Sequence, residues 1–293
     1  MLLLSPSPLL SPPSAALHVP LRASPRRLRL SASPPLDDEH AFYSPFIEST
    51  MALLREHHVE LQPYALDDSL RRRDSRAVRL AAEAYASPKL RQLRLVHLYG
   101  SPKLQVLNLC LFPRLEYGLP SFAADLVSLP GGHLVALDWS PNGEDYTRGE
   151  RGGGAAAALR RAFATHRAAL PGGGEVPAAA ARYFSECFLF TRLPRVSPPS
   201  ADAEAVRAAI LPAFEDYLRL YLQVLEDASP LSNEAELAEV RKAHLEYQNY
   251  RAEKDPARGM LTSLFGVEFT ERLIHEVLFD LPVWLASPAR QAR

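Results

Sequence analysis

Residues 122–141, FAADLVSLPGGHLVALDWSP, decide the fold around them. Two apolar runs flank a Pro-Gly-Gly sequence at 130–132, a combination typical of two antiparallel strands joined by a tight turn. Asp125 breaks this pattern, because on a strand of period two it shares an apolar face with Val127 and Leu129. An ionised carboxylate on such a face costs on the order of several kcal/mol unless it is paired or protonated. Asp125 is therefore a candidate functional residue.

The preceding apolar run, KLQVLNLCLF at 103–112, has a polar residue in an equivalent place. Asn108 shares a face with Val106 and Cys110 when the run is extended. If the apolar faces of the two runs lie on the same side of a sheet, Asn108 and Asp125 approach each other. The alternative is that each is a structural polar group, hydrogen-bonded to backbone or water.

The pattern of apolar runs predicts the fold class. The strand-like runs lie at 89–99, 103–112, 122–129, 133–139 and 183–191. The first four are close enough in sequence for hairpin connections, which predicts an antiparallel meander. A Gly- and Ala-rich insertion, 142–180, contains one predicted helix near 156–168.

Helical patterns surround these strands. One helix is expected at 44–58, with Ser44 as N-cap and Pro45 at the first helical position. Long amphipathic helices are predicted at 202–227, with a kink or break at Pro212, and at 234–254; shorter ones follow near 256–265 and 268–279. Predicted helices precede and follow the strand-forming runs along the chain. This order predicts an α/β fold, a three-layer α/β/α sandwich with a central antiparallel sheet, in one domain from 37 to 293.

A third polar feature lies in YQNYRAEKDPARGML, residues 247–261. Tyr247, Arg251 and Asp255 are four residues apart, which puts them on one face of a helix. Asp255 precedes a proline and so suits a helix N-cap, and Arg251 with Asp255 suits a surface ion pair. The functional alternative is a second acid that faces the sheet. Two acids in an apolar cleft have raised pKa values and can donate protons.

Composition excludes several classes of protein. The chain has 293 residues, is 47% hydrophobic and has a formal charge of −1. No apolar run is long enough to span a membrane. The two cysteines lie in apolar runs, as buried thiols do, and no nucleotide-binding or metal-binding motif appears. The sequence therefore predicts no bound metal, nicotinamide or flavin.

Residues 1–36 differ from the rest of the chain. They contain four of the 33 basic residues and none of the 34 acidic ones, and they are rich in serine and proline. This composition predicts a plastid transit peptide. Prolines in the apolar stretch argue against a secretory signal, and a disordered tail is the other alternative. The remaining chain, with 29 basic and 34 acidic residues, has a charge near −5 and is not a general nucleic-acid binder.

A dense basic cluster follows the first helix. Residues 68–80, DSLRRRDSRAVRL, contain Arg71, Arg72, Arg73, Arg76 and Arg79. Such a cluster is most often a solvated face, but it also suits the docking of an acidic partner.

Two long blocks of sequence, 104–141 and 253–281, resemble the ferredoxin-dependent bilin reductases. Together with the pattern of predicted helices and strands between the blocks, the resemblance covers about residues 42–282, apart from the insertion at 142–180. The resemblance implies an α/β/α sandwich that binds a linear tetrapyrrole between the sheet and the C-terminal helices. It implies electrons taken singly from reduced [2Fe-2S] ferredoxin and no bound metal or organic cofactor. The predicted transit peptide implies a place in the chloroplast stroma. Further partners would be a preceding or following bilin enzyme, or an apoprotein.

The resemblance also implies roles for single residues. Asp125 matches the central sheet aspartate of the family, a proton donor to the bilin, and Asp255 matches a second acid. Asn108 and Val96 stand where the phycocyanobilin-forming branch has a histidine and a glutamate. The bilin propionates need cations, for which two arginines are candidates, Arg251 and Arg258.

The likeness of LPGGHLVALD, residues 129–138, is greatest to the branch that reduces the A-ring diene of 15,16-dihydrobiliverdin to give phycoerythrobilin. The alternatives are reduction of biliverdin to 15,16-dihydrobiliverdin or to phytochromobilin, and red chlorophyll catabolite reduction on the same fold. A bilin carrier without redox activity is the non-enzymatic alternative; it needs the pocket but not both acids.

Overall fold

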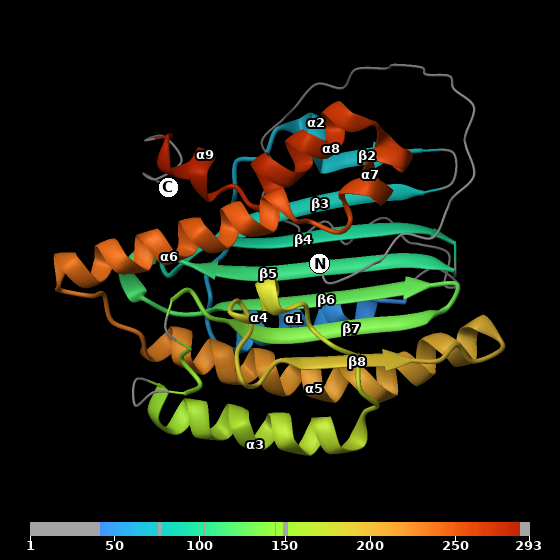
Figure 1. The fold of residues 1–293 in the computed structure, drawn as a ribbon, viewed down its shortest axis with the longest axis horizontal. Coiled ribbons are helices and arrows are strands. Elements are labelled where there is room, and N and C mark those ends of the chain that lie inside the picture. Colours follow the sequence, from blue (N-terminus) through green and yellow to red (C-terminus); the bar gives the residue numbers. More distant parts are fainter. Residues whose placement is uncertain (1–41, 76–77, 102, 144, 149–151, 288–293) are drawn as a thin grey trace.

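A wholly antiparallel sheet forms the middle layer of the protein (Figure 1). The computed structural model describes residues 42–75, 78–101, 103–143, 145–148 and 152–287. Within them the strand order is β1-β3-β4-β5-β6-β7-β8, and β2 also pairs with β3. The strands are β1 (Gln62–Pro63), β2 (Arg72–Asp74), β3 (Arg79–Ala86), β4 (Leu90–Ser101), β5 (Leu104–Pro113), β6 (Ser121–Leu129), β7 (Gly132–Ser140) and β8 (Leu189–Leu193). The predicted meander is confirmed as β4 to β7.

The turn between β6 and β7 requires glycine. Leu129 pairs with Gly132, so the chain reverses at once after β6. Gly132 has a φ of 137°, and a Cβ atom built on it would lie 2.7 Å from the carbonyl oxygen of Leu193 on β8. A side chain fits neither this backbone conformation nor this approach. Glycine at 132 therefore lets the edge strand β8 close onto the hairpin.

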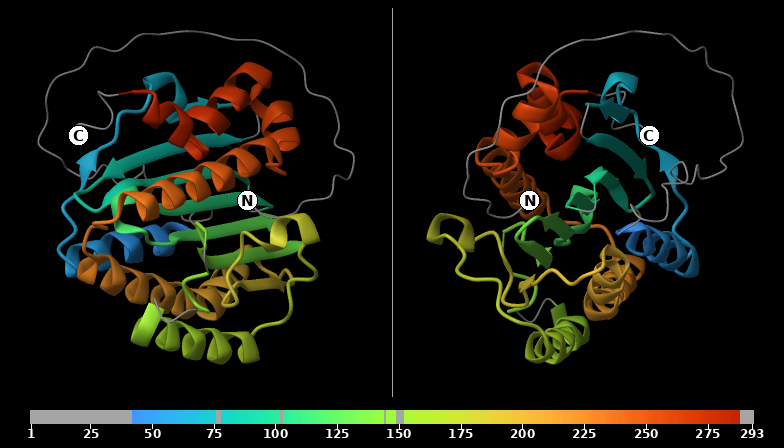
Figure 2. Two further views of the ribbon diagram at one scale, coloured as in Figure 1. Left: turned by 60° about the vertical axis from the view of Figure 1, so that its left-hand side comes forward. Right: turned by 90° about the vertical axis from the view of Figure 1, so that its right-hand side faces the viewer.

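One face of the sheet is covered by α1 (Ser44–Glu56), α5 (Pro199–Asp227) and, packed on α5, α3 (Gly153–Ala169). The leucines of alternate positions on β4 and β5, Phe122 on β6 and Trp139 on β7 pack against α5 in one apolar core. The opposite face is covered by α6 (Glu234–Glu253), α7 (Arg258–Phe265), α8 (Val267–Leu273), the π-helical turn η4 (Ile274–Leu278) and α9 (Leu281–Leu285). Figure 2 shows the two groups of helices on opposite sides of the sheet, which confirms the three-layer sandwich.

Short elements connect these layers: α2 (Asp68–Arg71), the 3-10 turn η2 (Leu115–Tyr117) and α4 (Ala178–Ala181). No helix in the described ranges is both long and apolar enough to cross a membrane.

Several predicted boundaries were wrong, for physical reasons. Helix α1 begins at Ser44 with Tyr43 as N-cap, so Ser44 is helical and Pro45 follows it. Helix α5 runs through Pro212, because buried side chains on both sides of the proline, Ile210 and Phe214, hold the helix on the sheet. The run 183–191 is extended only from Leu189, since the preceding residues form a loop. Strand β3 was not predicted, because its alternating residues are mostly alanine.

A buried polar network fixes the start of α5 to the β6–β7 hairpin. The Ser128 hydroxyl bonds both the Tyr43 hydroxyl and His133 Nδ1, each at 2.7 Å. His133 Nε2 lies 3.0 Å from Asp202, which also accepts from Arg195. Ser, His and Asp are the residue types of a hydrolytic triad, but Ser128 is wholly buried. The network is therefore structural and presents no nucleophile to a substrate.

Candidate active site

A pocket lies between the middle strands of the sheet and the C-terminal helices. Its free volume is only about 30 Å³, well below the roughly 300 Å³ or more of most small-molecule sites, so its walls must move to admit a ligand. Strands β4 to β7 form its floor, and α6, residue 279 and the loop before β8 form its walls. Its lining residues are Arg94, Asn108, Cys110, Ala123, Ala124, Asp125, Ala136, Asp138, Ser140, Phe184, Phe188, Tyr247, Arg251 and Phe279.

Asn108 and Asp125 meet on the floor of this pocket. They are direct partners in the register of β5 and β6. The Asn108 side-chain amide donates to Asp125 Oδ1 at 3.3 Å, and both residues are buried. The predicted approach is confirmed, and each polar group has the other as a side-chain partner. The floor thus carries an acid among apolar walls.

Arg94 extends this pair on β4. Its guanidinium donates to Asn108 Oδ1 at 2.8 Å and to Cys110 Sγ at 3.2 Å, and it is only 2% exposed. A guanidinium can only donate, so the Asn108 carbonyl oxygen must face Arg94 and its amino group must face Asp125. The three side chains form a directional chain of hydrogen bonds across three strands. The sequence contained the same signal for Arg94 as for Asp125, a charged residue inside an apolar run.

Asp138 on β7 is a second acid that lines the pocket, and it was not predicted. It accepts hydrogen bonds from the Ser185 hydroxyl at 2.5 Å, the Ser185 amide at 3.2 Å and the Ser140 hydroxyl at 3.3 Å. Burial raises the pKa of Asp138 to about 7, although the bonds from Ser185 act to lower it. Asp138 therefore ties the loop before β8 to the floor and titrates near neutral pH.

Aromatic rings form the walls. Phe184 and Phe188 stack with centroids 4.2 Å apart and rings inclined by 18°, and Phe190 continues the stack behind them. Tyr247 on α6 is buried in the pocket, and burial raises its pKa, so the phenol keeps its proton at neutral pH. Flat apolar walls over a polar floor suit a flat, conjugated ligand that carries a few polar groups.

On the helical side, the predicted arrangement is only partly correct. Tyr247 and Arg251 both line the pocket from α6, and the Arg251 guanidinium lies 6.0 Å from the Phe279 ring centroid. Asp255 does not share their helix face, because α6 ends at Glu253. It lies in the turn before α7, and its Oδ1 accepts from the Ala257 amide at 2.8 Å. The capping alternative was wrong as well, because α7 begins at Arg258 with Ala257 as its N-cap, and Asp255 instead closes the turn before the helix.

Two predicted residues are outside the lining of the pocket. Asp255 is buried, and among the described residues its second oxygen, Oδ2, has no hydrogen-bond partner. Arg258 forms an ion pair with Glu271 on α8 and donates to the Ala252 carbonyl oxygen. These bonds hold Arg258 between α6 and α8 rather than in the pocket.

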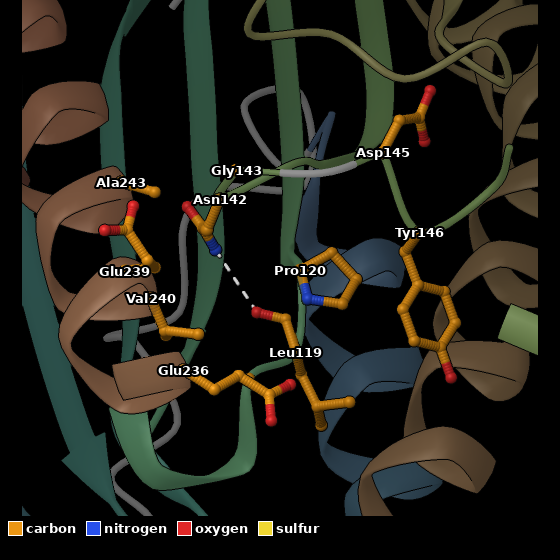
Figure 3. Close-up of a pocket in the computed structure, with 11 residues that line it drawn as sticks. Leu119, Pro120, Asn142, Gly143, Asp145, Tyr146, Glu236, Glu239, Val240 and Ala243 are labelled. Carbon is orange, nitrogen blue, oxygen red and sulfur yellow. Dashed lines mark hydrogen bonds between the residues drawn. The ribbon is translucent and has the colours of Figure 1, made fainter. Parts of the chain in front are cut away.

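A second hollow near the start of α6 has the wrong charge for an anionic ligand (Figure 3). Three carboxylates line it, those of Asp145, Glu236 and Glu239. The Asn142 amide donates to the Leu119 carbonyl oxygen at 3.3 Å, which joins the end of β7 to the connection before β6. A ligand with carboxylates of its own is repelled here, so the pocket at Asp125 is the candidate active site.

Comparisons with known proteins identify the family of the chain. The family model for ferredoxin-dependent bilin reductase matches residues 49–280. The phycoerythrobilin:ferredoxin oxidoreductase of Gloeobacter violaceus is 43% identical, over 82% of this chain and 95% of its own. The enzyme of the same name from Nostoc punctiforme is 37% identical, over 82% of this chain and 93% of its own.

Among solved structures, tomato phytochromobilin synthase in complex with biliverdin has a similar fold, with a TM-score of 0.72 and 24% identity; the match covers 84% of this chain and 85% of that one. The fold, the family match and the two relatives define the class of protein. This chain belongs to the ferredoxin-dependent bilin reductases. It is an oxidoreductase that reduces a bilin with electrons from ferredoxin.

The raised pKa of Asp138 predicts a pH dependence of stability. In the folded state the pKa is about 7, against 3.8 for an unperturbed aspartate, so the folded protein binds the proton more readily than the unfolded one. As pH rises from about 4 through 7, Asp138 should lower the free energy of unfolding, by up to roughly 4 kcal/mol for a shift of three units.

Urea unfolding of the wild type and Asp138→Asn at pH 5 and pH 8 measures this effect. The stability advantage of the wild type over the variant should shrink at the higher pH. Glu204→Gln, an exposed change on α5, should show no such trend. Parallel behaviour of the wild type and Asp138→Asn would contradict the assigned titration.

Proposed function

We propose that this protein reduces 15,16-dihydrobiliverdin to phycoerythrobilin at the A-ring diene. The observation that carries the proposal is a buried acid, Asp125, on the floor of an apolar pocket in a chain of this family. The similarity to proteins named phycoerythrobilin:ferredoxin oxidoreductase supports the particular substrate. Asn108 and Val96, which face each other across β4 and β5, depart from the pair that the phycocyanobilin-forming branch has at these positions.

The chemistry follows from charge. Reduction of one double bond takes two electrons and two protons, and each reduced ferredoxin supplies one electron and leaves oxidised. Every electron makes the bound bilin more negative, and a buried anion is costly unless a proton neutralises it. Asp125 lies on the floor with Oδ1 held by Asn108, so its carboxyl can deliver one proton to the ring system. Water then restores the proton to the carboxylate.

We assign the second proton to Asp255. This assignment is supported by the surroundings of the Asp255 carboxyl group, which is buried. One of its oxygens accepts a hydrogen bond from the Ala257 amide, and the other has no hydrogen-bond partner in the described part of the chain. Movement of the turn between α6 and α7 would bring this acid to a bound bilin.

The proposed reaction is tested by an anaerobic assay with ferredoxin and a reducing system. Biliverdin and 15,16-dihydrobiliverdin are offered separately, and products are identified by chromatography. We expect conversion of 15,16-dihydrobiliverdin to phycoerythrobilin and no change in biliverdin. Conversion of biliverdin would contradict the assigned step. Binding of both bilins without any conversion would favour a carrier.

We further propose that the bilin itself takes the electrons, without a bound metal or organic cofactor. The support is the resemblance to the family and the lack of cofactor motifs in the sequence. The purified protein should then be colourless and bind bilin one to one. A tightly bound flavin, or turnover with NADPH in the absence of ferredoxin, would overturn this proposal.

Asp125→Asn tests the proposed proton donor. The change keeps the shape and a hydrogen-bonding group but removes the acid. The variant should bind bilin, accept one electron and stop as a radical with an altered visible spectrum, with turnover lower by a factor of about 10² to 10⁴. Asp255→Asn should stop at a different step and accumulate a different product. If both variants turn over within a few-fold of the wild type, the two acids are structural.

We propose that ferredoxin docks on the basic cluster around β2. Arg71 pairs with Asp68 and Arg79 with Asp74, whereas Arg72 and Arg73 are exposed and are in no ion pair with another described residue. Arg76 lies outside the described residues. Two exposed guanidiniums suit the acidic surface of a plant-type ferredoxin, although the chain as a whole is slightly acidic.

Charge reversal at Arg72 and Arg73 tests this docking surface. Arg72→Glu with Arg73→Glu should raise the Michaelis constant for ferredoxin and leave bilin affinity unchanged, and wild-type turnover should fall as salt rises. Arg207→Glu with Arg241→Glu makes the same change in total charge on α5 and α6, and serves as the control. Equal effects of the two double variants would place the docking surface elsewhere.

We propose that residues 1–36 direct import into the plastid stroma. The support is their composition, basic, serine-rich and free of acids; they lie outside the described residues. A fluorescent protein fused to this segment should enter plastids, and a cytosolic fusion would contradict the proposal.

A further inference from the structure

We infer that the positive charge of Arg94 is a functional element of the pocket: it stabilises the negative charge that the bound bilin gains with each electron. This inference rests on the proposed function, because it concerns the same pocket and the same electron transfer. Three observations support the inference. Arg94 is buried, its hydrogen-bond partners are neutral, and it lies near Asp125, the proposed proton donor.

A buried guanidinium normally has a carboxylate partner, and the chain contains an example on the same strand. Arg91 on β4 is buried and donates to Asp280 Oδ1 at 2.6 Å. Arg94, three residues further on, is equally buried, and its hydrogen-bond acceptors are an amide oxygen and a thiol sulfur. Among the described residues, no carboxylate forms an ion pair with it. Arg94 thus keeps an unneutralised charge where solvation by water is poor.

A buried, unpaired charge lowers the stability of the folded protein, and a neutral side chain could donate the hydrogen bond to Asn108 in its place. A glutamine at 94 would donate to Asn108 Oδ1 equally well and would remove the cost of burying an ion. The Arg94 guanidinium also lies between the rings of Phe112 and Phe279, at 5.4 and 5.5 Å. Faces of aromatic rings attract a cation but do not cancel its charge. In the part of the chain that the structure describes, the pocket therefore holds a cation with no carboxylate in direct contact.

The other charged groups around the pocket do not remove this excess. Asn108 lies between Arg94 and Asp125 in the chain of hydrogen bonds, so the guanidinium and the carboxyl group do not pair directly. Asp138 accepts three hydrogen bonds from Ser140 and Ser185. Tyr247 stays neutral, and Arg251 adds a second positive charge to the lining. The lining therefore carries two guanidinium groups, those of Arg94 and Arg251, toward which an anionic ligand is attracted.

The positive charge of Arg94 acts during electron transfer from ferredoxin to the bilin. Ferredoxin gives up one electron and is oxidised, and the bilin accepts it and becomes a radical anion before the proton from Asp125 arrives. A fixed positive charge within a few ångströms favours that anion strongly in a pocket of low dielectric. The same arginine orients the Asn108 amide toward Asp125, so charge stabilisation and proton delivery use one chain of hydrogen bonds.

Two substitutions separate charge from hydrogen bonding. Arg94→Gln keeps a donor for Asn108 and removes the charge, whereas Arg94→Lys keeps the charge. Gln105→Leu is the control, because Gln105 is also buried but lies on β5 among the residues of the opposite face. Thermal unfolding and bilin titration establish that each variant folds and binds.

The first readout does not need turnover. The visible absorption of bound biliverdin reports protonation of its pyrrole nitrogens, and a nearby cation disfavours the protonated form. Arg94→Gln should raise the pKa of bound biliverdin by about one unit, a ten-fold change in proton affinity, while Arg94→Lys and Gln105→Leu should leave it near the wild-type value.

The second readout is the rate of electron uptake by the bilin-loaded enzyme after rapid mixing with reduced ferredoxin. Arg94→Gln should slow it at least about ten-fold at every salt concentration, because the charge is buried, and Arg94→Lys should restore most of the rate. The inference is overturned if Arg94→Gln keeps the wild-type pKa, or if the lysine variant loses as much as the glutamine variant. A wild-type enzyme that reduces no bilin would refute the proposed function, and the biliverdin titration would still decide the role of Arg94.

Discussion

The pairing of Asn108 with Asp125 is the contact on which the candidate active site depends. It exists because β5 and β6 pair in a register that sets these two residues directly opposite each other. A slip of one residue would turn Asp125 to the opposite face of the sheet, among the side chains that pack against α5. The close return of the chain at Gly132 and the packing of Phe122 and Trp139 against α5 hold that register. The apolar face thus positions the polar one.

The two faces of the sheet divide stability from chemistry. The face toward α5 is almost wholly apolar, and its one large polar network ties the helix to the hairpin. The face toward α6 carries the buried ionisable residues Arg94 on β4, Asp125 on β6 and Asp138 on β7. Groups of this kind lower stability unless they are fully paired, so their concentration in one pocket indicates a site kept for reaction. Electron transfer to a flat, apolar ligand requires both a cation and a proton source.

The sequence predicted those parts of the site that depend on strand periodicity. Asp125 and Asn108 were recognised because a polar residue in an apolar run of period two must enter an apolar face. The same argument applies to Arg94 and Asp138, which were missed. Asp138 lies near the end of its run, and Arg94 lies in a run that contains other polar residues. The predicted helix at 234–254 ends within one residue of the observed end of α6 at Glu253. Local pattern did not reveal that Arg258 pairs with Glu271, because this pairing depends on how α7 and α8 pack together. Strand β3 escaped prediction because alanines carry a weak β signal.

The most direct test of the account is the crystal structure of the complex with 15,16-dihydrobiliverdin, grown without oxygen or reductant. The account predicts that the tetrapyrrole lies between the sheet and α6, with the Asp125 carboxyl within hydrogen-bond distance of the ring system and the Arg94 guanidinium beneath it. It also predicts that Phe184 and Phe188 move to admit the ligand, since the free volume of the pocket is only about 30 Å³ before a ligand binds, far below the roughly 300 Å³ or more of a small-molecule site. A bilin bound in the hollow of Figure 3, or with Asp125 out of reach of every ring, would contradict the account.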